Sequence, residues 1–248
     1  MIHVENGFPE VGPDFMCPTA FFDFDVDTVR RFAYDAVKDA PTQKEKAIKL
    51  FYAVRDSIRY DPYSISLDPE PYKASHVLAA GRAYCLPKAN LLIAVARAVG
   101  IPAGIGLSDV LNHLCTERLR RMMGNKEVFL HHGYAVLHID GSWVKAAPAF
   151  NIELCNKFDV LPTEFDGEHN ALFQPVDALG RDHMEYVKDH GIWSDFPLDR
   201  VIKDFTEYYP ASIYDPSART AVDAEIEAEK QAASRSPGTG FENEKPIT

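Results

Sequence analysis

The chain has 248 residues, 46% hydrophobic and 25% charged, which is typical of a globular protein with one substantial core. Its net charge of −11 argues against general nucleic-acid binding, which needs a basic face. No apolar run approaches the roughly 20 residues of a membrane span, and the first residues lack the pattern of a signal peptide. We therefore expect a cytoplasmic protein with neither a membrane nor a nucleic acid as partner.

Apolar residues at helical spacing predict three helices in the first hundred residues. They cover about 28–38, 42–59 and 85–99. Thr42 and Glu45 fit a capping box at the start of the second helix. The first part of the chain is therefore expected to be mainly helical.

The middle of the chain predicts an antiparallel hairpin. Residues 132–139 read as a strand, Asp140-Gly141 favours a two-residue type I′ turn, and 142–147 reads as the returning strand. A strand at 103–107 and a basic, helical insertion within 111–130 are expected before it.

Toward the C-terminus the pattern predicts short helices near 182–188 and 198–208. Beyond Ser217 the composition shifts to Ala, Glu, Lys and Ser, and then to a Pro- and Gly-containing tail. We expect a single domain over 1–216, followed by an exposed helix and a disordered tail over 217–248.

The cysteines point to free thiols, because they are widely spaced and form no CxxC pair. Neither a metal site nor a cofactor is expected. Cys85 stands at the expected start of a helix, where the helix dipole lowers a thiol pKa and free N–H groups can hold an oxyanion. On periodicity alone, the simpler interpretation is a small buried residue at a helix start.

His132 is the candidate base for this thiol. The hairpin register places it opposite Ala149, with Ala147 and Asn151 as diagonal neighbours on the same face. A catalytic imidazole needs its second nitrogen held, and Asn151 can do this whereas Ala147 cannot. We predict Asn151 in that role.

Other interpretations of these residues stay open. The simplest for His131-His132 is a polar strand entrance, and a metal site is disfavoured because adjacent strand residues point to opposite faces. A later acidic residue could replace Asn151 as the partner of His132. The acidic candidates are Asp166, Asp182 and Glu185.

Taken together, these segments resemble the core of the transglutaminase-like superfamily, which includes bacterial proteins described as cysteine proteases. In that family a catalytic Cys opens a helix that ends in an Arg-Ala-x-Gly-Ile-Pro-Ala type sequence, as Cys85 and residues 97–103 do here. A His-x-aromatic strand, a tight turn, a Trp and an Asp-Pro follow. The matching residues here are His132, Tyr134, Asp140-Gly141, Trp143 and Ala147-Pro148. The resemblance covers about residues 45–150.

The resemblance implies an α+β fold with a papain-like, transglutaminase-like core. The Cys helix would pack on an antiparallel sheet, with extra C-terminal helices. It also implies thiol-dependent acyl transfer on a peptide or small amide substrate, through a Cys85 thioester with His132 as general base and acid. Water as acceptor would make the protein a peptidase or amidase, and an amine would make it a transglutaminase.

One position departs from the family pattern. The Asp that precedes the Pro in the family, its third catalytic residue, is Ala147 here. This difference motivates the alternative hypothesis of a non-catalytic transglutaminase-like module for binding or scaffolding.

Overall fold

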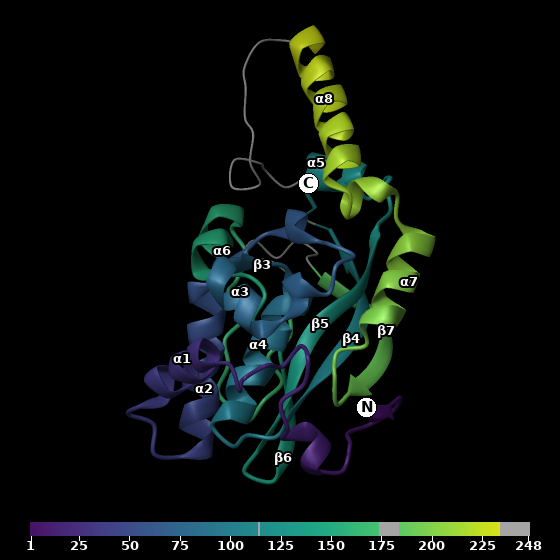
Figure 1. Ribbon diagram of the computed structural model, residues 1–248. Helices are drawn as coiled ribbons and strands as arrows, with labels where there is room; N and C mark the ends of the chain where they lie inside the picture. Colours follow the sequence, from purple (N-terminus) through teal and green to yellow (C-terminus); the bar gives the residue numbers. More distant parts are fainter. Residues whose placement is uncertain (114, 174–183, 234–248) are drawn as a thin grey trace.

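The computed structural model describes residues 1–113, 115–173 and 184–233, and an antiparallel sheet lies at its centre (Figure 1). The five strands pair in the order β1-β7-β4-β5-β6, and every neighbouring pair is antiparallel. A second, two-stranded sheet pairs β2 with β3 in parallel. The strands are β1 (His3–Val4), β2 (Arg59–Tyr60), β3 (Arg82–Ala83), β4 (Ala103–Asn112), β5 (Val128–Ile139), β6 (Ser142–Ala146) and β7 (Met184–Trp193).

Eight α-helices accompany the sheet in the described part of the chain, and together they confirm the predicted α+β fold. The central one, α4, packs against β5 and contacts α1, α2 and α3 (Figure 1). The helices are α1 (Asp27–Val37), α2 (Gln43–Ser57), α3 (Ala74–Ala80), α4 (Cys85–Ala98), α5 (Glu117–Met122), α6 (Ile152–Phe158), α7 (Leu198–Tyr208) and α8 (Pro216–Ala233). Short 3-10 helices are η1 (Pro13–Phe15), η2 (Pro62–Ser64), η3 (Glu70–Tyr72) and η4 (Ala211–Ile213).

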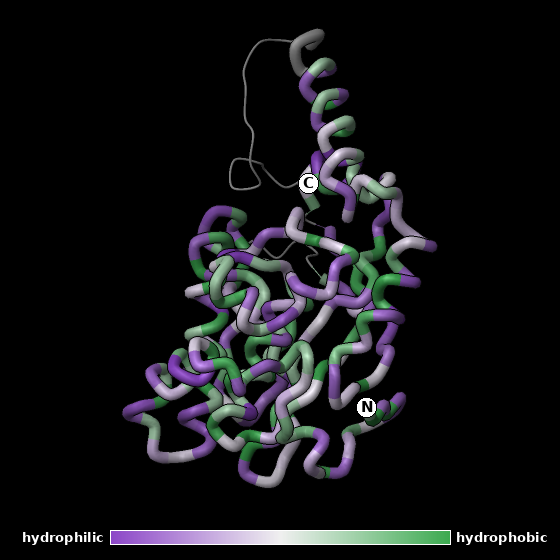
Figure 2. Tube along the Cα trace, viewed as in Figure 1, coloured by the Kyte–Doolittle hydropathy of each residue, from purple (hydrophilic) through white to green (hydrophobic). Residues whose placement is uncertain are grey.

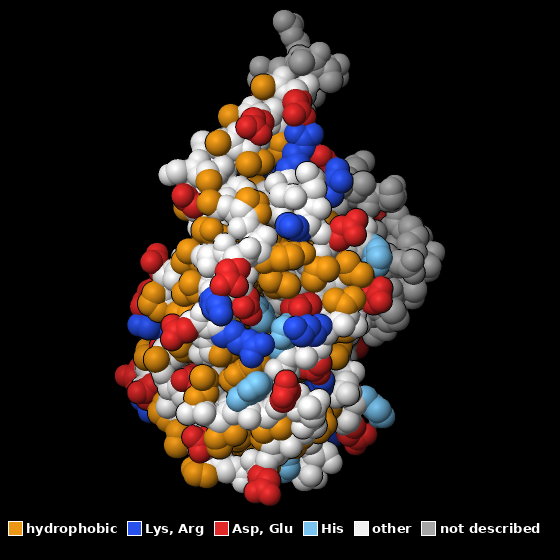
Figure 3. Space-filling view, turned by 90° about the vertical axis from the view of Figure 1, so that its right-hand side faces the viewer, with side chains coloured by type: hydrophobic (Ala, Val, Ile, Leu, Met, Phe, Trp, Pro, Cys, Tyr) orange, Lys and Arg blue, Asp and Glu red, His pale blue; other side chains and the backbone are white. Residues whose placement is uncertain are grey.

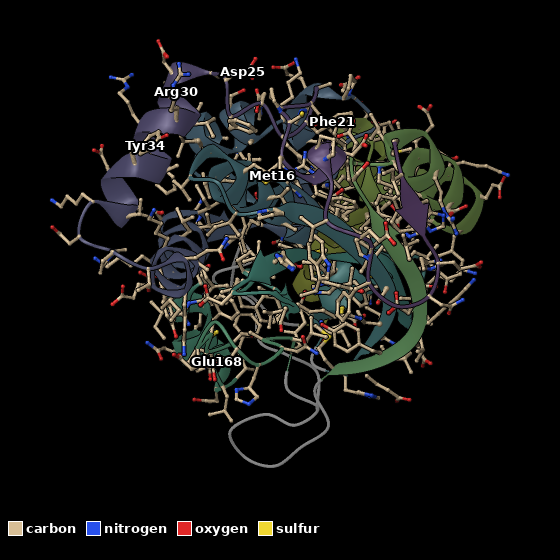
Figure 4. All side chains as sticks on the ribbon, turned by 90° about the horizontal axis from the view of Figure 1, so that it is seen from below. Met16, Phe21, Asp25, Arg30, Tyr34 and Glu168 are labelled. Carbon is tan, nitrogen blue, oxygen red and sulfur yellow. The ribbon has the colours of Figure 1, made fainter. Side chains whose placement is uncertain are left out.

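The outer helices expose polar faces. Figure 2 shows hydrophilic residues along the outer sides of α1 and α2, and Figure 4 shows Arg30 and Tyr34 on the outer side of α1. The predicted capping box of α2 is confirmed: the Thr42 hydroxyl accepts a hydrogen bond from the Glu45 N–H, and the Glu45 carboxylate accepts one from the Thr42 N–H. These two helices therefore form an outer layer over α4.

Helix α4 is apolar on nearly all sides, as expected for a helix enclosed by others. Its last turn is held by Arg97, which is 2% exposed. The guanidinium donates hydrogen bonds to the backbone carbonyls of Ala103, Cys17 and Ser194. Because these carbonyls belong to β4, the N-terminal segment and the residue after β7, one side chain ties α4 to three parts of the fold.

The predicted hairpin is confirmed, including its register. Ile139 pairs with Ser142 and Ala135 with Ala146, and both turn residues, Asp140 and Gly141, have positive φ as a type I′ turn requires. The returning strand β6 ends before Pro148. The strand pairing therefore stops short of Asn151.

One local prediction was wrong and another is confirmed. Residues 184–188, expected to be helical, belong to the strand β7, which pairs with β4 on one side and β1 on the other. There, pairing between strands far apart in the sequence overrides the local pattern. The basic helical insertion expected within 111–130 is α5, which carries Arg118, Arg120 and Arg121. Residues 182 and 183 lie outside the described residues.

Helix α8 extends away from the rest of the protein (Figure 1). Two ion pairs join α5 to α8: Arg118 with Asp223 at 2.6 Å, and Arg121 with Glu229 at 2.7 Å. The predicted disordered tail, 234–248, lies outside the described residues, and the division of the chain after residue 216 stays a prediction. No described helix combines the length and apolar composition that a membrane span requires.

Candidate active site

Cys85 is the first residue of α4, and its thiol is buried against the neighbouring strand. Burial raises the pKa of the thiol to about 11, although the nearby backbone N–H groups of Gly133, Leu86 and Cys85 itself favour its ionised form. Two of these donors are free because the first N–H groups of a helix have no partner inside it. The sulfur thus sits where N–H groups converge, in surroundings that keep it protonated.

Gly133 allows the start of α4 to approach β5 this closely. A Cβ atom at position 133 would lie 2.6 Å from Cδ2 and 3.0 Å from Cα of Leu86. Any larger residue would therefore push the helix away from the strand. His132, the residue before Gly133, lines the same cavity as Cys85.

His132 lies among aromatic rings. Its ring centroid is 4.7 Å from that of Phe173 and 6.1 Å from that of Tyr186. Burial lowers the pKa of the imidazole to about 3, so the ring is neutral at neutral pH. Within the described part of the chain, its buried Nε2 has no hydrogen-bond partner. A ring nitrogen without a partner is the kind of group that a substrate or an incoming proton can engage.

The predicted hydrogen bond from Asn151 to His132 is not found among the described residues. The Asn151 Oδ1 accepts a hydrogen bond from the Tyr60 N–H at 3.0 Å, and its Nδ2 donates to the Glu153 carboxylate at 2.6 Å. The reason is that the strand ends before Pro148, so Asn151 becomes the residue preceding α6 instead of a strand neighbour of His132.

The acidic alternatives do not supply a partner for His132 within the described residues. One of them bonds locally: its carboxylate accepts from the Glu168 and His169 N–H groups and from the His169 ring. Figure 4 shows Glu168 of this turn at the periphery of the molecule. The residue that bonds locally is Asp166. Glu185 is exposed on β7, and Asp182 lies outside the described residues.

Lys88, which the sequence did not single out, fastens the first turns of α4. Its ammonium, fully buried, donates to the backbone carbonyls of Arg55 at 2.8 Å and Ile58 at 2.5 Å. These carbonyls end α2, where a cation is favoured by the helix dipole. Burial lowers the pKa of Lys88 to about 7. Because Lys88 stands one turn after Cys85, this contact fixes the position of the candidate nucleophile.

The neighbouring His131 belongs to a buried polar cluster that the sequence did not predict. Its Nε2–H donates to the Asp204 carboxylate at 2.6 Å, and its backbone N–H donates to Asp109 at 3.0 Å. Asp109 also accepts from the His190 Nε2–H at 2.8 Å. Figure 3 shows charged and histidine side chains gathered across the middle of the face that carries α7. An Asp within the apolar strand β4 is the signal that could have revealed this cluster.

Three members of this cluster could hold a metal, since ligand atoms of Asp109, His131 and His190 lie within 4.8 Å of one another. The Arg200 Nη2 lies 3.3 Å from the His190 Nδ1. A guanidinium can only donate, so Nδ1 accepts and the ring proton is on Nε2. A protonated nitrogen is not a metal ligand. In this tautomer the atoms of the cluster left to bind a metal are the Asp109 carboxylate and the His131 Nδ1, which has no hydrogen-bond partner among the described residues.

A cavity of about 70 Å³ lies beside the candidate nucleophile. Cys85 and His132 both line it. Among the described residues, its wall contains no Asp, Glu, Lys or Arg side chain. The other lining residues are Tyr60, Pro62, Ile65, Tyr84, Val110, Asn112, Cys115, Thr116, Leu119, Met123, Phe129, Leu130, Phe150, Leu154, Phe158, Val160, Met184, Phe205, Tyr209 and Ile213.

Comparison with known families confirms the resemblance found in the sequence: residues 30–148 match the model of the transglutaminase-like superfamily. The matched segment contains Cys85, Gly133 and His132 and ends before Asn151. A comparison with curated proteins finds no match.

Two solved structures are similar to about half of this chain. One is described as a putative cysteine protease from Cytophaga hutchinsonii, with 17% identity and a TM-score of 0.41, covering 54% of this chain and 40% of that one. The other is described as a putative protease from Parabacteroides distasonis, with 18% identity and a TM-score of 0.35, covering 52% of this chain and 26% of that one. The similarity thus spans less than half the length of each of the two solved proteins.

Proposed function

We propose that this chain, whose residues 30–148 match the transglutaminase-like superfamily, is a thiol-dependent acyl-transfer enzyme that cleaves an amide. Cys85 would be the nucleophile and His132 the general base and acid. The observation that carries the proposal is a close approach: a Cβ atom at Gly133, the strand residue next to His132, would lie 3.0 Å from Cα of Leu86, the residue after Cys85. Both side chains face one cavity.

The proposed reaction gives each of these groups one role. The Cys85 sulfur attacks the amide carbonyl while its proton passes to His132. The N–H groups at the start of α4 stabilise the charge on the carbonyl oxygen. His132 then protonates the leaving amine as the C–N bond breaks and a thioester forms. Water, deprotonated by His132, cleaves the thioester and releases the acid and the thiol.

The charge states of the two residues favour concerted proton transfer. Burial raises the pKa of the Cys85 thiol and lowers that of His132, so the resting pair is a neutral thiol and a neutral imidazole. A preformed thiolate–imidazolium pair would have to be stabilised in a site that excludes water. We therefore infer that the thiol loses its proton only as the sulfur attacks.

The same observations support the alternative of a non-catalytic binding module. Ala147 stands where the family has its third catalytic residue, and Asn151 is bonded elsewhere. An imidazole that is not held in one tautomer is a weaker base. In that case the cavity would bind a ligand without changing it.

Mass spectrometry of the intact protein separates the two functions. After incubation with an activated acyl donor such as a p-nitrophenyl ester, the enzyme should carry one acyl group on Cys85. The Cys85→Ala variant should carry none there, and Cys17→Ser, which removes an exposed thiol, should behave like the wild type. Acylation that persists in Cys85→Ala, or is absent from the wild type, would refute the proposed nucleophile.

A further inference from the structure

We propose that the cavity beside Cys85 receives an aliphatic acyl chain, so that the acyl donor of this site is a fatty-acyl amide and not a polar peptide. The inference rests on the acyl-transfer function proposed for Cys85. The occupant follows from that chemistry: once the carbonyl carbon is at the sulfur, the acyl chain is the part of the substrate beside the nucleophile, where the cavity lies.

The first support is the chemistry of the wall. No charged side chain lines the cavity among the described residues. Thr116, one of its few polar residues, uses its hydroxyl to accept a hydrogen bond from the Leu119 N–H at 3.2 Å, as the cap of α5. The wall is thus dominated by aliphatic and aromatic groups.

The second support is the orientation of the tyrosine on the far wall. The Tyr209 hydroxyl donates to the Val128 carbonyl at 3.1 Å and accepts from the Leu130 N–H at 2.7 Å. Its polar end is therefore occupied by the backbone of β5, and its ring is left to line the cavity. Phe205 of α7 and Ile213 of η4 complete this wall with fully apolar side chains that are each 2% exposed.

The third support is the origin of that wall. Tyr209, Phe205 and Ile213 come from residues 198–213, outside the segment 30–148 that matches the family model. The chemistry-bearing residues thus belong to the family core, whereas this apolar wall is supplied by a later part of the chain. The feature is consistent with a substrate preference specific to this protein.

The physical consequence is a preference that grows with chain length. Burial of one methylene is worth roughly a threefold to fourfold gain in kcat/KM, as long as the chain still fits. A peptide in the same place would have to bury amide groups without partners, which is unfavourable. Long aliphatic acyl groups should therefore react faster than acetyl groups or peptides.

Two measurements on the full-length protein test the inference. The first compares kcat/KM for acetyl, hexanoyl and decanoyl p-nitroanilides. The second measures the thermal unfolding midpoint with 2-dodecanone or 2-butanone, which resemble the acyl donor but have no leaving group. We expect kcat/KM to rise at least tenfold from acetyl to decanoyl, and the midpoint to rise with 2-dodecanone only.

Substitutions at Ile213 sharpen the test. Ile213→Trp should fill the cavity and abolish the advantage of decanoyl over hexanoyl. The matched control is Ile202→Trp on α7, a residue outside the cavity wall. If Ile213→Trp does not fold, Ile213→Ala should enlarge the cavity and shift the preference toward chains longer than decanoyl.

The outcomes distinguish this inference from the function on which it rests. Equal rates for acetyl and decanoyl donors, or faster cleavage of peptide anilides, would overturn the acyl-chain assignment and leave acyl transfer by Cys85 standing. A midpoint raised by 2-dodecanone without acylation of Cys85 would overturn the enzymatic function and leave the cavity as a site for an aliphatic chain. If the protein neither binds 2-dodecanone nor cleaves any of the anilides, both the acyl-chain assignment and the enzymatic function would be overturned.

Discussion

His131 and His132 are consecutive in the chain and both are buried, yet their surroundings differ. The His131 Nε2–H donates to one carboxylate and its backbone N–H to a second, while its Nδ1 has no hydrogen-bond partner among the described residues. His132 is enclosed by aromatic rings, and none of the described residues bonds its buried Nε2. Two carboxylates thus tie His131 to the fold and none of the described ones holds His132; a buried nitrogen without a partner has a cost that function can justify.

The backbone explains how neighbours come to differ. The pairing of β4 with β5 shifts register between Ser108 and Val110, and His131 at this irregularity adopts a left-handed conformation with φ of 54°. An extra residue in one strand re-aims the side chains around it. The bulge thus lets one histidine join the cluster with Asp109 while the next joins the cavity of Cys85.

The largest expected effect is the difference in kcat/KM between variants in which each histidine is replaced separately. We expect His132→Gln to lower kcat/KM by roughly a hundredfold to ten-thousandfold, because general acid–base catalysis contributes that much. His131→Gln should change it by less than about tenfold. The measurement is the hydrolysis of an acyl p-nitroanilide by folded protein of each variant. Similar losses in both variants would show that the two histidines do not have separate roles.

Acid should reveal the cost of burying His132. Its folded-state pKa of about 3 is below the ordinary value near 6.5, so between these values the unfolded chain binds the proton more readily. Stability contributed by the neutral ring is present above pH 6.5 and is lost as the pH falls toward 3. Between pH 7 and pH 4.5, His132→Gln should lose roughly 2–3 kcal/mol less stability than the wild type. Urea unfolding at both pH values measures this, and equal losses would contradict the assignment.

Removing His131 should cost stability and leave the chemistry intact. His131→Leu deprives Asp204 of its donor, and we expect a loss of roughly 1–3 kcal/mol in the free energy of unfolding. Urea unfolding at pH 7 measures it. The comparison is Arg200→Ala, on the helix α7 that also carries Asp204. Arg200 contacts the cluster from its exposed side, so its loss should lower the free energy of unfolding by less. A stability equal to that of the wild type in His131→Leu would mean that the cluster does not stabilise the fold.

The smallest effect is expected at Asn151. Its amide bonds the Tyr60 N–H and Glu153, so Asn151→Ala should lower stability by about 1 kcal/mol and kcat/KM by less than about tenfold. Asn151→Asp keeps an acceptor for the Tyr60 N–H and serves as control. A much larger loss of turnover, with stability unchanged, would restore the role that the sequence predicted for Asn151.

Features that depend on nearby residues were predictable from the sequence. The cap at Thr42 and Glu45, the helix from Cys85 and the register around Asp140-Gly141 follow from propensity and turn chemistry, and the structure confirms them. Cys85 and His132 were paired through the order of motifs in a known family, and in the structure both line one cavity. Local rules and family resemblance thus led to the candidate site.

Features that depend on distant pairing could not be predicted in this way. His190 meets Asp109 only because β7 lies beside β4, and β7 itself has no clear local strand signal. The partner of Asn151 is the N–H of Tyr60, about ninety residues earlier. The contribution of Ile213 to the cavity depends on where η4 packs. In each case the deciding contact is tertiary.

The strand order also has a consequence for the synthesis of the protein. In β1-β7-β4-β5-β6, the strand β4 pairs on one side with β5, which follows it closely, and on the other with β7, which leaves the ribosome some seventy residues later. Until then one edge of β4, an apolar strand of ten residues, has no partner. Open edges of this kind favour association between chains. A nascent chain that stalls before Met184 is therefore expected to aggregate, and chaperones that cover apolar strands should bind it in that interval.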